Sequence, residues 1–282
     1  MNDPNRITAA TLNIWGDQGP WAERCLLIVD EVDRVIPDIL ALQEVLRPAG
    51  PGTSQADQLA HRLRQRLPVY YGRAHNIGQP TRSSEFGNAI LTHYTVHDHC
   101  VLPLTTPPGV EPRSALYLLL ATTFGLLPVL TTHLSWEPKL WSVRTQQLAL
   151  IRAFLADRLE EIPNRFPLGL AVFPPLLLGD LNAIPESAEI GEMTRQQPGV
   201  LTFDDTFAMV GTGIQETFSS RNPYCPPNDP MLNKRLDYIL QARTLGSKHM
   251  VPASSSVCFM YHEDGTYCSD HFGVETCFTI LR

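Results

Sequence analysis

The chain has 282 residues, of which 43% are hydrophobic and 18% are charged, and this balance excludes a protein that is mainly disordered. Its 22 Lys and Arg against 29 Asp and Glu give a net charge of −7, which argues against tight, non-specific binding of a nucleic-acid duplex. The 24 prolines indicate many turns and loops, and the sequence contains no heptad run or long repeat.

Signals for secretion or membrane insertion are missing from the sequence. The first residues lack the basic and apolar regions of a signal peptide. The most apolar stretch, 115–130, is too short and too often interrupted to span a bilayer. The six cysteines form no C-x-x-C pair and are expected to be reduced thiols. We therefore expect a cytoplasmic protein with no transmembrane segment and no obligate protein partner.

The first elements alternate between strands and amphipathic helices. Residues 7–15 are rich in β-forming residues and predict a strand, and the apolar run 39–42 predicts a strand that is buried on both faces. Between them a helix is predicted that ends before Pro37. Its apolar face comprises Cys25, Ile28, Val29, Val32 and Ile36, and its solvent face comprises Glu23, Arg24, Glu31 and Arg34. A second amphipathic helix is marked by Leu59, Leu63 and Leu67.

The remainder is richer in strands. Residues 69–134 have strand and hairpin patterns, with loops at 78–84 and 105–112 and a turn near Gly125. Helices are predicted at 144–159 and from Ser187, and strands at 176–178, 235–240, 256–261 and 272–280. Because 69–134 breaks any strict β–α alternation, a doubly wound sheet and a TIM barrel are excluded. We expect one domain over residues 1–282 with an α+β layered sandwich fold.

Polar side chains follow several of these apolar strands, where the strands end. They are Asn13, Glu44, His133, Asp180, Asn182, Asp237, Asp270 and His271. A single Asp or Asn in such a place usually serves a turn, but strands of one sheet end at a common edge, so many such residues can form one cluster. Hard oxygen ligands in that pattern favour Mg²⁺, with Mn²⁺ or Ca²⁺ as alternatives, over Zn²⁺.

Seven short motifs carry these residues in a fixed order. They are Thr11-Leu12-Asn13-Ile14-Trp15, Leu42-Gln43-Glu44-Val45, Gly87-Asn88-Ala89-Ile90-Leu91, Thr132-His133-Leu134, Gly179-Asp180-Leu181-Asn182, Arg235-Leu236-Asp237-Tyr238-Ile239 and Ser269-Asp270-His271-Phe272-Gly273. Each motif is weak alone. Together they resemble the endonuclease/exonuclease/phosphatase superfamily of metal-dependent phosphoesterases, which includes DNase I, exonuclease III and the neutral sphingomyelinases.

The resemblance implies a four-layer αββα sandwich, with two packed β-sheets between helices, and a metal-dependent phosphoric ester hydrolase. It implies these roles for the motif residues: Asn13, Glu44 and Asp270 as metal ligands, Asp180 and Asn182 for the water and a phosphate oxygen, His133 and His271 at the phosphate, and Asp237 orienting His271. Which of Asp180 and His271 takes the proton of the water is left open.

The substrate is less well defined. The resemblance implies a phosphodiester: a nucleic acid, a nucleotide or a phospholipid headgroup. Trp15, Asn88, Trp136 and Arg221 are candidates for the substrate rim, and Trp141 for a lip beside it. Relatives often have Ser-Arg where this chain has Thr92-His93, so a cation near the rim is expected to be missing or to be replaced by a titratable side chain. The alternatives are a sphingomyelinase-like phospholipid phosphodiesterase and a catalytically inactive binding module of the same fold.

Overall fold

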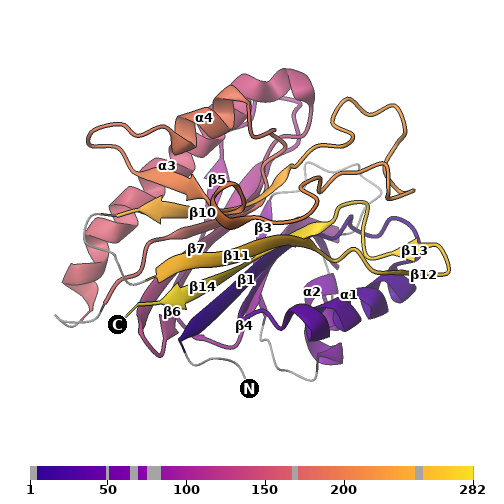
Figure 1. The fold of residues 1–282 in the computed structure, drawn as a ribbon, viewed down its shortest axis with the longest axis horizontal. Helices are drawn as coiled ribbons and strands as arrows, with labels where there is room; N and C mark the ends of the chain where they lie inside the picture. Colours follow the sequence, from indigo (N-terminus) through magenta and orange to yellow (C-terminus); the bar gives the residue numbers. More distant parts are fainter. Residues whose placement is uncertain are drawn as a thin grey trace.

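The computed structural model describes residues 5–48, 51–63, 69–74, 84–166, 171–244 and 250–281. Two six-stranded sheets pack face to face, and helices cover both outer faces (Figure 1). The four-layer α+β sandwich expected from the sequence is therefore confirmed. No helix among the described residues is long and apolar enough to cross a membrane.

The first sheet has the strand order β11-β14-β1-β2-β4-β3. Its strands are β1 (Arg6–Asn13), β2 (Ile39–Pro48), β3 (Val69–Ala74), β4 (Ser84–Thr92), β11 (Met250–Cys258) and β14 (Gly273–Ile280). Strands β1 and β2 are parallel, and α1 (Trp21–Val35) connects them. Helices α1 and α2 (Gln55–Arg62) lie on the outer face of this sheet (Figure 1).

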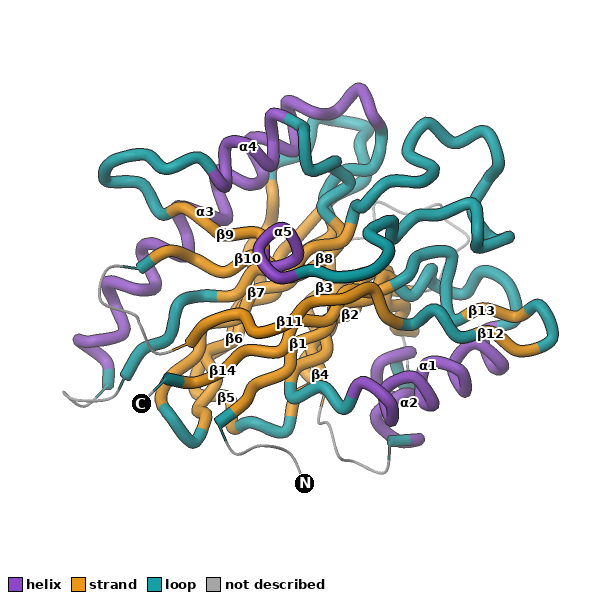
Figure 2. Tube along the Cα trace, in the orientation of Figure 1, coloured by secondary structure: helices purple, strands orange, loops and turns teal. Residues whose placement is uncertain are grey.

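The second sheet has the order β5-β6-β7-β8-β10-β9. Its strands are β5 (Thr95–Leu104), β6 (Arg113–Thr122), β7 (Gly125–His133), β8 (Leu176–Asp180), β9 (Thr202–Asp205) and β10 (Asp237–Arg243). The helical segments are η1 (Pro138–Leu140), α3 (Trp141–Arg165), α4 (Ala188–Thr194) and α5 (Thr206–Val210), and β12 (His262–Glu263) with β13 (Thr266–Tyr267) forms a small hairpin. Helices α3 and α4 cover the outer face, on the side away from α1 and α2 (Figure 2).

Strand alternation builds three separate apolar layers. Along β6, Leu116, Leu118 and Leu120 point between the two sheets. Tyr117 and Leu119 on the same strand point outward, toward α3 and α4. A third layer packs α1 and α2 on the first sheet. Because both faces of the central strands are covered, their sequences read as continuous apolar runs.

Most predicted elements are present, with several corrections. The strand predicted at 256–261 is wrong in position, because β11 runs Met250–Cys258. The strand β9, helix α5 and the β12–β13 hairpin were not predicted. None of these helices and strands is longer than five residues, which is too short to show a periodic pattern. Leu67 and nearly all of the predicted 78–84 loop lie outside the described residues.

The predicted solvent face of α1 is also wrong in part. Arg24 is completely buried, Glu31 is nearly so, and Ile36, expected on the apolar face, is 53% exposed. The Arg24 guanidinium donates hydrogen bonds to the carbonyl oxygens of Ile14 (2.7 Å), Gly16 (2.9 Å) and Cys268 (3.0 Å). This side chain therefore joins α1 to the turn after β1 and to the segment before β14.

Gly179 occupies the point of closest approach between two strands at the site. Its φ is +139°, and a Cβ there would lie 2.0 Å from the carbonyl oxygen of Thr132 on β7. We expect Gly179→Ala to destabilise the fold by more than about 3 kcal/mol in denaturant unfolding. Gly199→Ala is the control, since it has a positive φ with open space around it, and it should cost only about 1 kcal/mol. Equal losses would show that backbone strain, not the collision, decides the effect.

Candidate active site

The ends of the central strands bring the predicted polar residues together. Asn13 ends β1, and His133 and Asp180 end the parallel strands β7 and β8, where they face each other in register. Asp237 begins β10 directly opposite Asp180. His271 lies two residues before β14 begins. The common edge expected from the sequence thus collects residues from both sheets.

Glu44 reaches this edge because β2 is irregular at that point. The pairing of β2 with β4 shifts between Leu42 and Val45, so two residues, Gln43 and Glu44, oppose the single Asn88. Glu44 has a φ of +57°, in the left-handed region. Gln43 turns inward and its amide donates to the hydroxyl oxygens of Thr11 and Thr131 between the sheets, so Glu44 is directed into the site.

Asn13 and Asp180 form the centre of the cluster. The amide of Asn13 donates to Glu44 Oε1 and to Asp180 Oδ2, at 3.1 Å each. Asp180 Oδ2 also lies 3.4 Å from His133 Nε2 and 3.7 Å from His271 Nε2. The backbone N–H of Asn182 donates to Asp180 Oδ1 (2.9 Å). One carboxylate is therefore within reach of both imidazoles.

Asp237 and His271 form a buried carboxylate–imidazole pair. Asp237 Oδ2 lies 2.9 Å from His271 Nδ1, and Phe218 packs against the imidazole with ring centroids 5.0 Å apart. The hydroxyl of Thr217 accepts the backbone N–H of Asp237 and holds the start of β10. Oδ1 of Asp237 is buried and has no hydrogen-bond partner among the described residues, which is costly for a carboxylate.

Burial and crowding shift the pKa values of these groups. Burial raises the pKa of Asp180 to about 6 and that of Asp270 to about 6, and it also raises the pKa of Glu44. Burial opposes protonation of His271, but the carboxylates of Asp237 and Asp180 raise its pKa well above the usual range. The pKa of His133 is lowered well below the usual range, by burial first and then by the nearby positive charges. The surroundings therefore favour the neutral form of His133 and the protonated form of His271.

The segment that carries Asp270 is held by residues that the sequence did not identify. Ser269 donates its hydroxyl to the carbonyl of Asn13 (2.6 Å). The amide of Asn222 donates to the carbonyls of Ser269 (2.7 Å) and Asp270 (3.1 Å), and Cys225 Sγ–H donates to the latter (3.0 Å). The 221–233 loop thus contributes to the site through Asn222 and Cys225.

Arg113 is the second feature that the sequence did not reveal. Its guanidinium Nη1 lies 3.3 Å from His133 Nδ1, and its Nη2 pairs with Glu111 at 3.0 Å. The side chain is 3% exposed, at the first position of β6. A cation is therefore present at the site, but it comes from this strand and not from the position of His93. A Pro-Arg step at a loop–strand junction was the one available signal.

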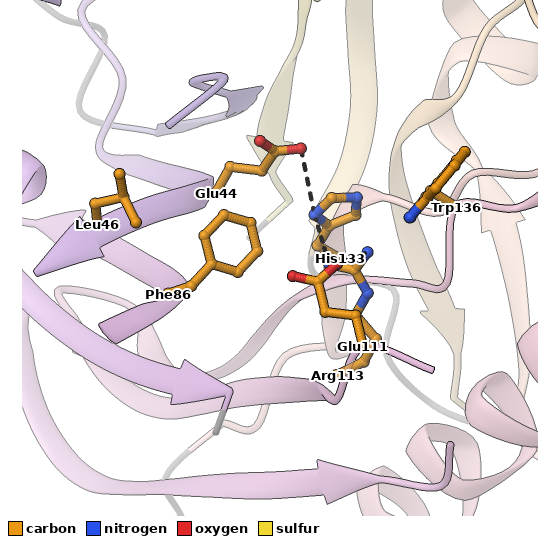
Figure 3. Close-up of a pocket in the computed structure, with 7 residues that line it drawn as sticks. All are labelled: Glu44, Leu46, Phe86, Glu111, Arg113, His133 and Trp136. Carbon is orange, nitrogen blue, oxygen red and sulfur yellow. Dashed lines mark hydrogen bonds and ion pairs between the residues drawn. The ribbon is translucent and has the colours of Figure 1, made fainter. Parts of the chain in front are cut away.

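Two cavities meet at Glu44, His133 and Trp136, which line both. The Arg113 cavity has about 320 Å³ and is completed by Leu46, Phe86, Glu111 and Arg113 (Figure 3). The Asp180 cavity has about 230 Å³ and is completed by Pro138, Asp180, Asn182, Phe218, Asp229, Pro230, Met231, Leu236, Asp270 and His271.

The four rim candidates lie in different places. Trp136 is 57% exposed and lines both cavities. Trp15 stacks on Tyr224 with centroids 4.9 Å apart and lines neither. Asn88 is buried, not at a rim, and its amide donates to the carbonyl of Ser114 (2.9 Å). Arg221 is exposed and lines neither cavity; Asp229, Pro230 and Met231 of its loop do line one. Trp141, at the start of α3, is as exposed as Trp136 but lies outside both cavities.

Two sets of donor atoms are suited to a metal ion. Asp180, Asp237 and His271 offer ligand atoms within 4.8 Å of one another and make a possible metal site. Asn13, Glu44 and Asp270 offer a set made of oxygens, although the Asn13 amide donates to Glu44. Three crowded carboxyl groups with raised pKa values and the unpartnered oxygen of Asp237 indicate missing positive charge, so the residues fit a cation.

Comparisons with known proteins show the family and the fold. Residues 10–271 match the model of the Endonuclease/Exonuclease/phosphatase family. TDP2 from D. rerio, complexed with single strand DNA product, is 19% identical with a TM-score of 0.74 over 97% of this chain and 99% of that chain. An endonuclease/exonuclease/phosphatase from Bacteroides vulgatus is 18% identical, with a TM-score of 0.73 over 98% and 99%. The human Nocturnin catalytic domain with bound sulfate anion is 19% identical, with a TM-score of 0.70 over 98% and 94%. No curated protein matches the chain by sequence.

Proposed function

The chain belongs to the endonuclease/exonuclease/phosphatase family, whose members are typically metal-dependent phosphoesterases, and from this premise we propose that it hydrolyses a phosphodiester with the help of Mg²⁺. One observation carries the proposal above all: Asp180 Oδ2 lies 3.4 Å from Nε2 of His133 and 3.7 Å from Nε2 of His271, and the pKa values of these two imidazoles are shifted in opposite directions. In such an arrangement the carboxylate can accept a proton while a neighbouring imidazole binds an anionic phosphate.

Asp180 is the proposed general base. Its pKa of about 6 leaves it ionised but basic at neutral pH, and Asn13 and Asn182 hold its two oxygens with hydrogen bonds. His271, held protonated by Asp237, donates to a non-bridging phosphate oxygen. Asp180 is preferred to His271 as the base because the carboxylates of Asp237 and Asp180 favour the protonated form of the imidazole.

Glu44, Asn13 and Asp270 are the proposed Mg²⁺ ligands. Their oxygens are hard donors, and Glu44 is 24% exposed and lines both cavities, so a phosphate can reach it. A bound divalent cation would neutralise negative charge that develops on the phosphate. Asp237 is assigned to His271 through Oδ2, and its Oδ1, which has no hydrogen-bond partner among the described residues, keeps the Asp180, Asp237 and His271 set as the alternative metal site.

The direct experiment measures hydrolysis of bis-(4-nitrophenyl) phosphate, single-stranded DNA, RNA and sphingomyelin by the purified protein, with Mg²⁺ and with EDTA. DNA comes first among the natural substrates, because a structural neighbour was solved with a DNA product. We expect Mg²⁺-dependent hydrolysis of at least one phosphodiester. Binding of the same compounds without turnover would favour the inactive-module alternative instead.

The raised carboxyl pKa values predict a pH-dependent effect of the cation on stability. Asp180 and Asp270 have pKa values of about 6 in the fold and about 3.8 when unperturbed, so folding favours their protonated forms. Their contribution is present below about pH 4 and is lost as the pH rises through 6, at a cost of up to about 3 kcal/mol each without cation. Mg²⁺ binds the ionised forms and should restore the stability that is lost when these carboxyl groups ionise.

We therefore expect Mg²⁺ to raise the Tm by several degrees more at pH 7.5 than at pH 5. Differential scanning fluorimetry measures this directly. Asp270→Asn should remove most of the difference, whereas Asp204→Asn, which changes a partly exposed carboxylate paired with Arg243, should keep it. A Tm increase that is the same at both pH values would contradict the assignment.

A further inference from the structure

The two cavities give the proposed reaction a direction. Glu44, His133 and Trp136 line both cavities and therefore mark the boundary between them. A phosphate that contacts Glu44 and the histidines lies at this boundary. A phosphodiester at that boundary extends one of its ester groups into each cavity. If the chain hydrolyses a phosphodiester, as proposed above, the chemistry of each cavity decides which ester group leaves.

The two sides of the boundary differ in chemistry. The Asp180 cavity contains the proton acceptor Asp180 and the Asp237–His271 pair behind it. The Arg113 cavity contains Arg113, the one Lys or Arg that lines either cavity in the part of the chain that the structure describes. Displacement at phosphorus places the attacking and leaving oxygens roughly in line on opposite sides. The attacking oxygen must lose a proton, and the leaving oxygen gains negative charge.

We infer that the leaving group of the phosphodiester occupies the Arg113 cavity and that Arg113 is a catalytic residue that stabilises the charge on the leaving oxygen. In the step, the water oxygen forms a bond to phosphorus and its proton passes to Asp180. The bond from phosphorus to the leaving oxygen breaks, and its electron pair stays on that oxygen, beside the guanidinium. Solvent then protonates the released alkoxide or phenoxide to the alcohol or phenol, and Asp180 returns its proton to solvent.

The walls of the Arg113 cavity define the kind of group that leaves. Phe86 and Leu46 lie on one side of the Glu44–His133 contact, and Trp136 lies on the other (Figure 3). Glu111, 43% exposed beside Arg113, adds a negative charge that disfavours a second phosphate. The leaving group is therefore an uncharged alcohol or phenol with an aromatic or apolar face.

Variation of the leaving group tests the role of Arg113. Methyl 4-nitrophenyl phosphate and methyl phenyl phosphate differ in how much charge the leaving oxygen carries. In Arg113→Gln we expect kcat to fall about 10-fold for the nitrophenyl ester and about 10³-fold for the phenyl ester. Arg113→Lys should recover part of the second loss, and circular dichroism checks the fold of each variant. Equal factors on both esters would overturn the inference, because a structural role lowers both alike.

A binding measurement tests the cavity without altering Arg113. We expect Phe86→Ala, which alters the Arg113 cavity and not the Asp180 cavity, to weaken phenyl phosphate about 10-fold in calorimetry with Ca²⁺ and to leave methyl phosphate unchanged. Met231→Ala, which alters the Asp180 cavity and not the Arg113 cavity, is the matched control and should change neither. Weakening of phenyl phosphate by Met231→Ala instead of Phe86→Ala would overturn the assignment of the cavity.

The outcomes separate this inference from the proposed function. Wild-type protein that hydrolyses neither ester and no other phosphodiester with Mg²⁺ would remove both. Hydrolysis by the wild type with equal losses on both esters in Arg113→Gln would remove the inference alone and would leave Arg113 a structural role.

Discussion

Glu44→Gln is expected to lower kcat/KM for a phosphodiester by on the order of 10³ at limiting Mg²⁺. The amide keeps the size of the side chain, and the Asn13 contact can be kept because Gln retains one acceptor oxygen. The variant loses the negative charge that would bind the cation. Steady-state kinetics over a Mg²⁺ series measures both the loss and the shift in metal dependence.

The fold should be unaffected by this change. Glu44 is partly exposed between two cavities, so its substitution leaves no buried charge unpaired. Circular dichroism and Tm should match the wild type within about 2 °C. Glu161→Gln, an exposed carboxylate on α3 that pairs with Arg158, is the control for a generic charge change. Turnover near the wild-type value at limiting Mg²⁺ would exclude Glu44 as a metal ligand.

Asp237→Asn is expected to lower kcat by about 10³–10⁴ while changing KM little. The carboxylate holds His271 protonated and oriented at 2.9 Å, and this contact strengthens as charge develops on the phosphate. A neutral amide keeps the position but loses the charge. Stopped-flow or steady-state kinetics with bis-(4-nitrophenyl) phosphate gives kcat and KM separately.

A double-mutant cycle shows whether the two residues act as a unit. His271→Ala should cost at least as much as Asp237→Asn, and the double variant should lose little beyond the worse single variant. Fully additive losses would show that Asp237 and His271 act independently. Arg221→Ala provides a comparison, since this exposed cation lines neither cavity, and its losses should be small on the same substrate.

The sequence predicted the layers and the strand-end cluster because both depend on short-range patterns. Apolar runs define central strands, and a polar residue that directly follows such a run must lie at the edge of the sheet. Asp180 and Asp237 illustrate this, since they end and begin adjacent strands and face each other. The order of the motifs then identified the family.

The residues that the sequence missed depend on long-range contacts. Arg24 satisfies helical periodicity on the polar side, yet its guanidinium is buried because three carbonyls from two distant segments converge on it. Arg113 reaches His133 only because β6 and β7 pair in one register. The position of Glu44 required a bulge, which no local pattern announces. Such features arise from tertiary packing, which local propensity does not encode.

The Arg24 contacts also tie the lifetime of the site to a peripheral helix. Because α1 supplies the guanidinium that holds the carbonyls of Ile14, Gly16 and Cys268, local unfolding of α1 withdraws all three contacts in one event. The separation of Asn13 and Asp270, next to those segments, then depends only on the hydrogen bonds of Ser269 and Asn222, although both sheets remain folded. Amide hydrogen exchange in α1 should consequently report on whether the cluster around Asn13 and Asp270 is assembled. Heat inactivation should follow the opening of this helix and should precede global unfolding.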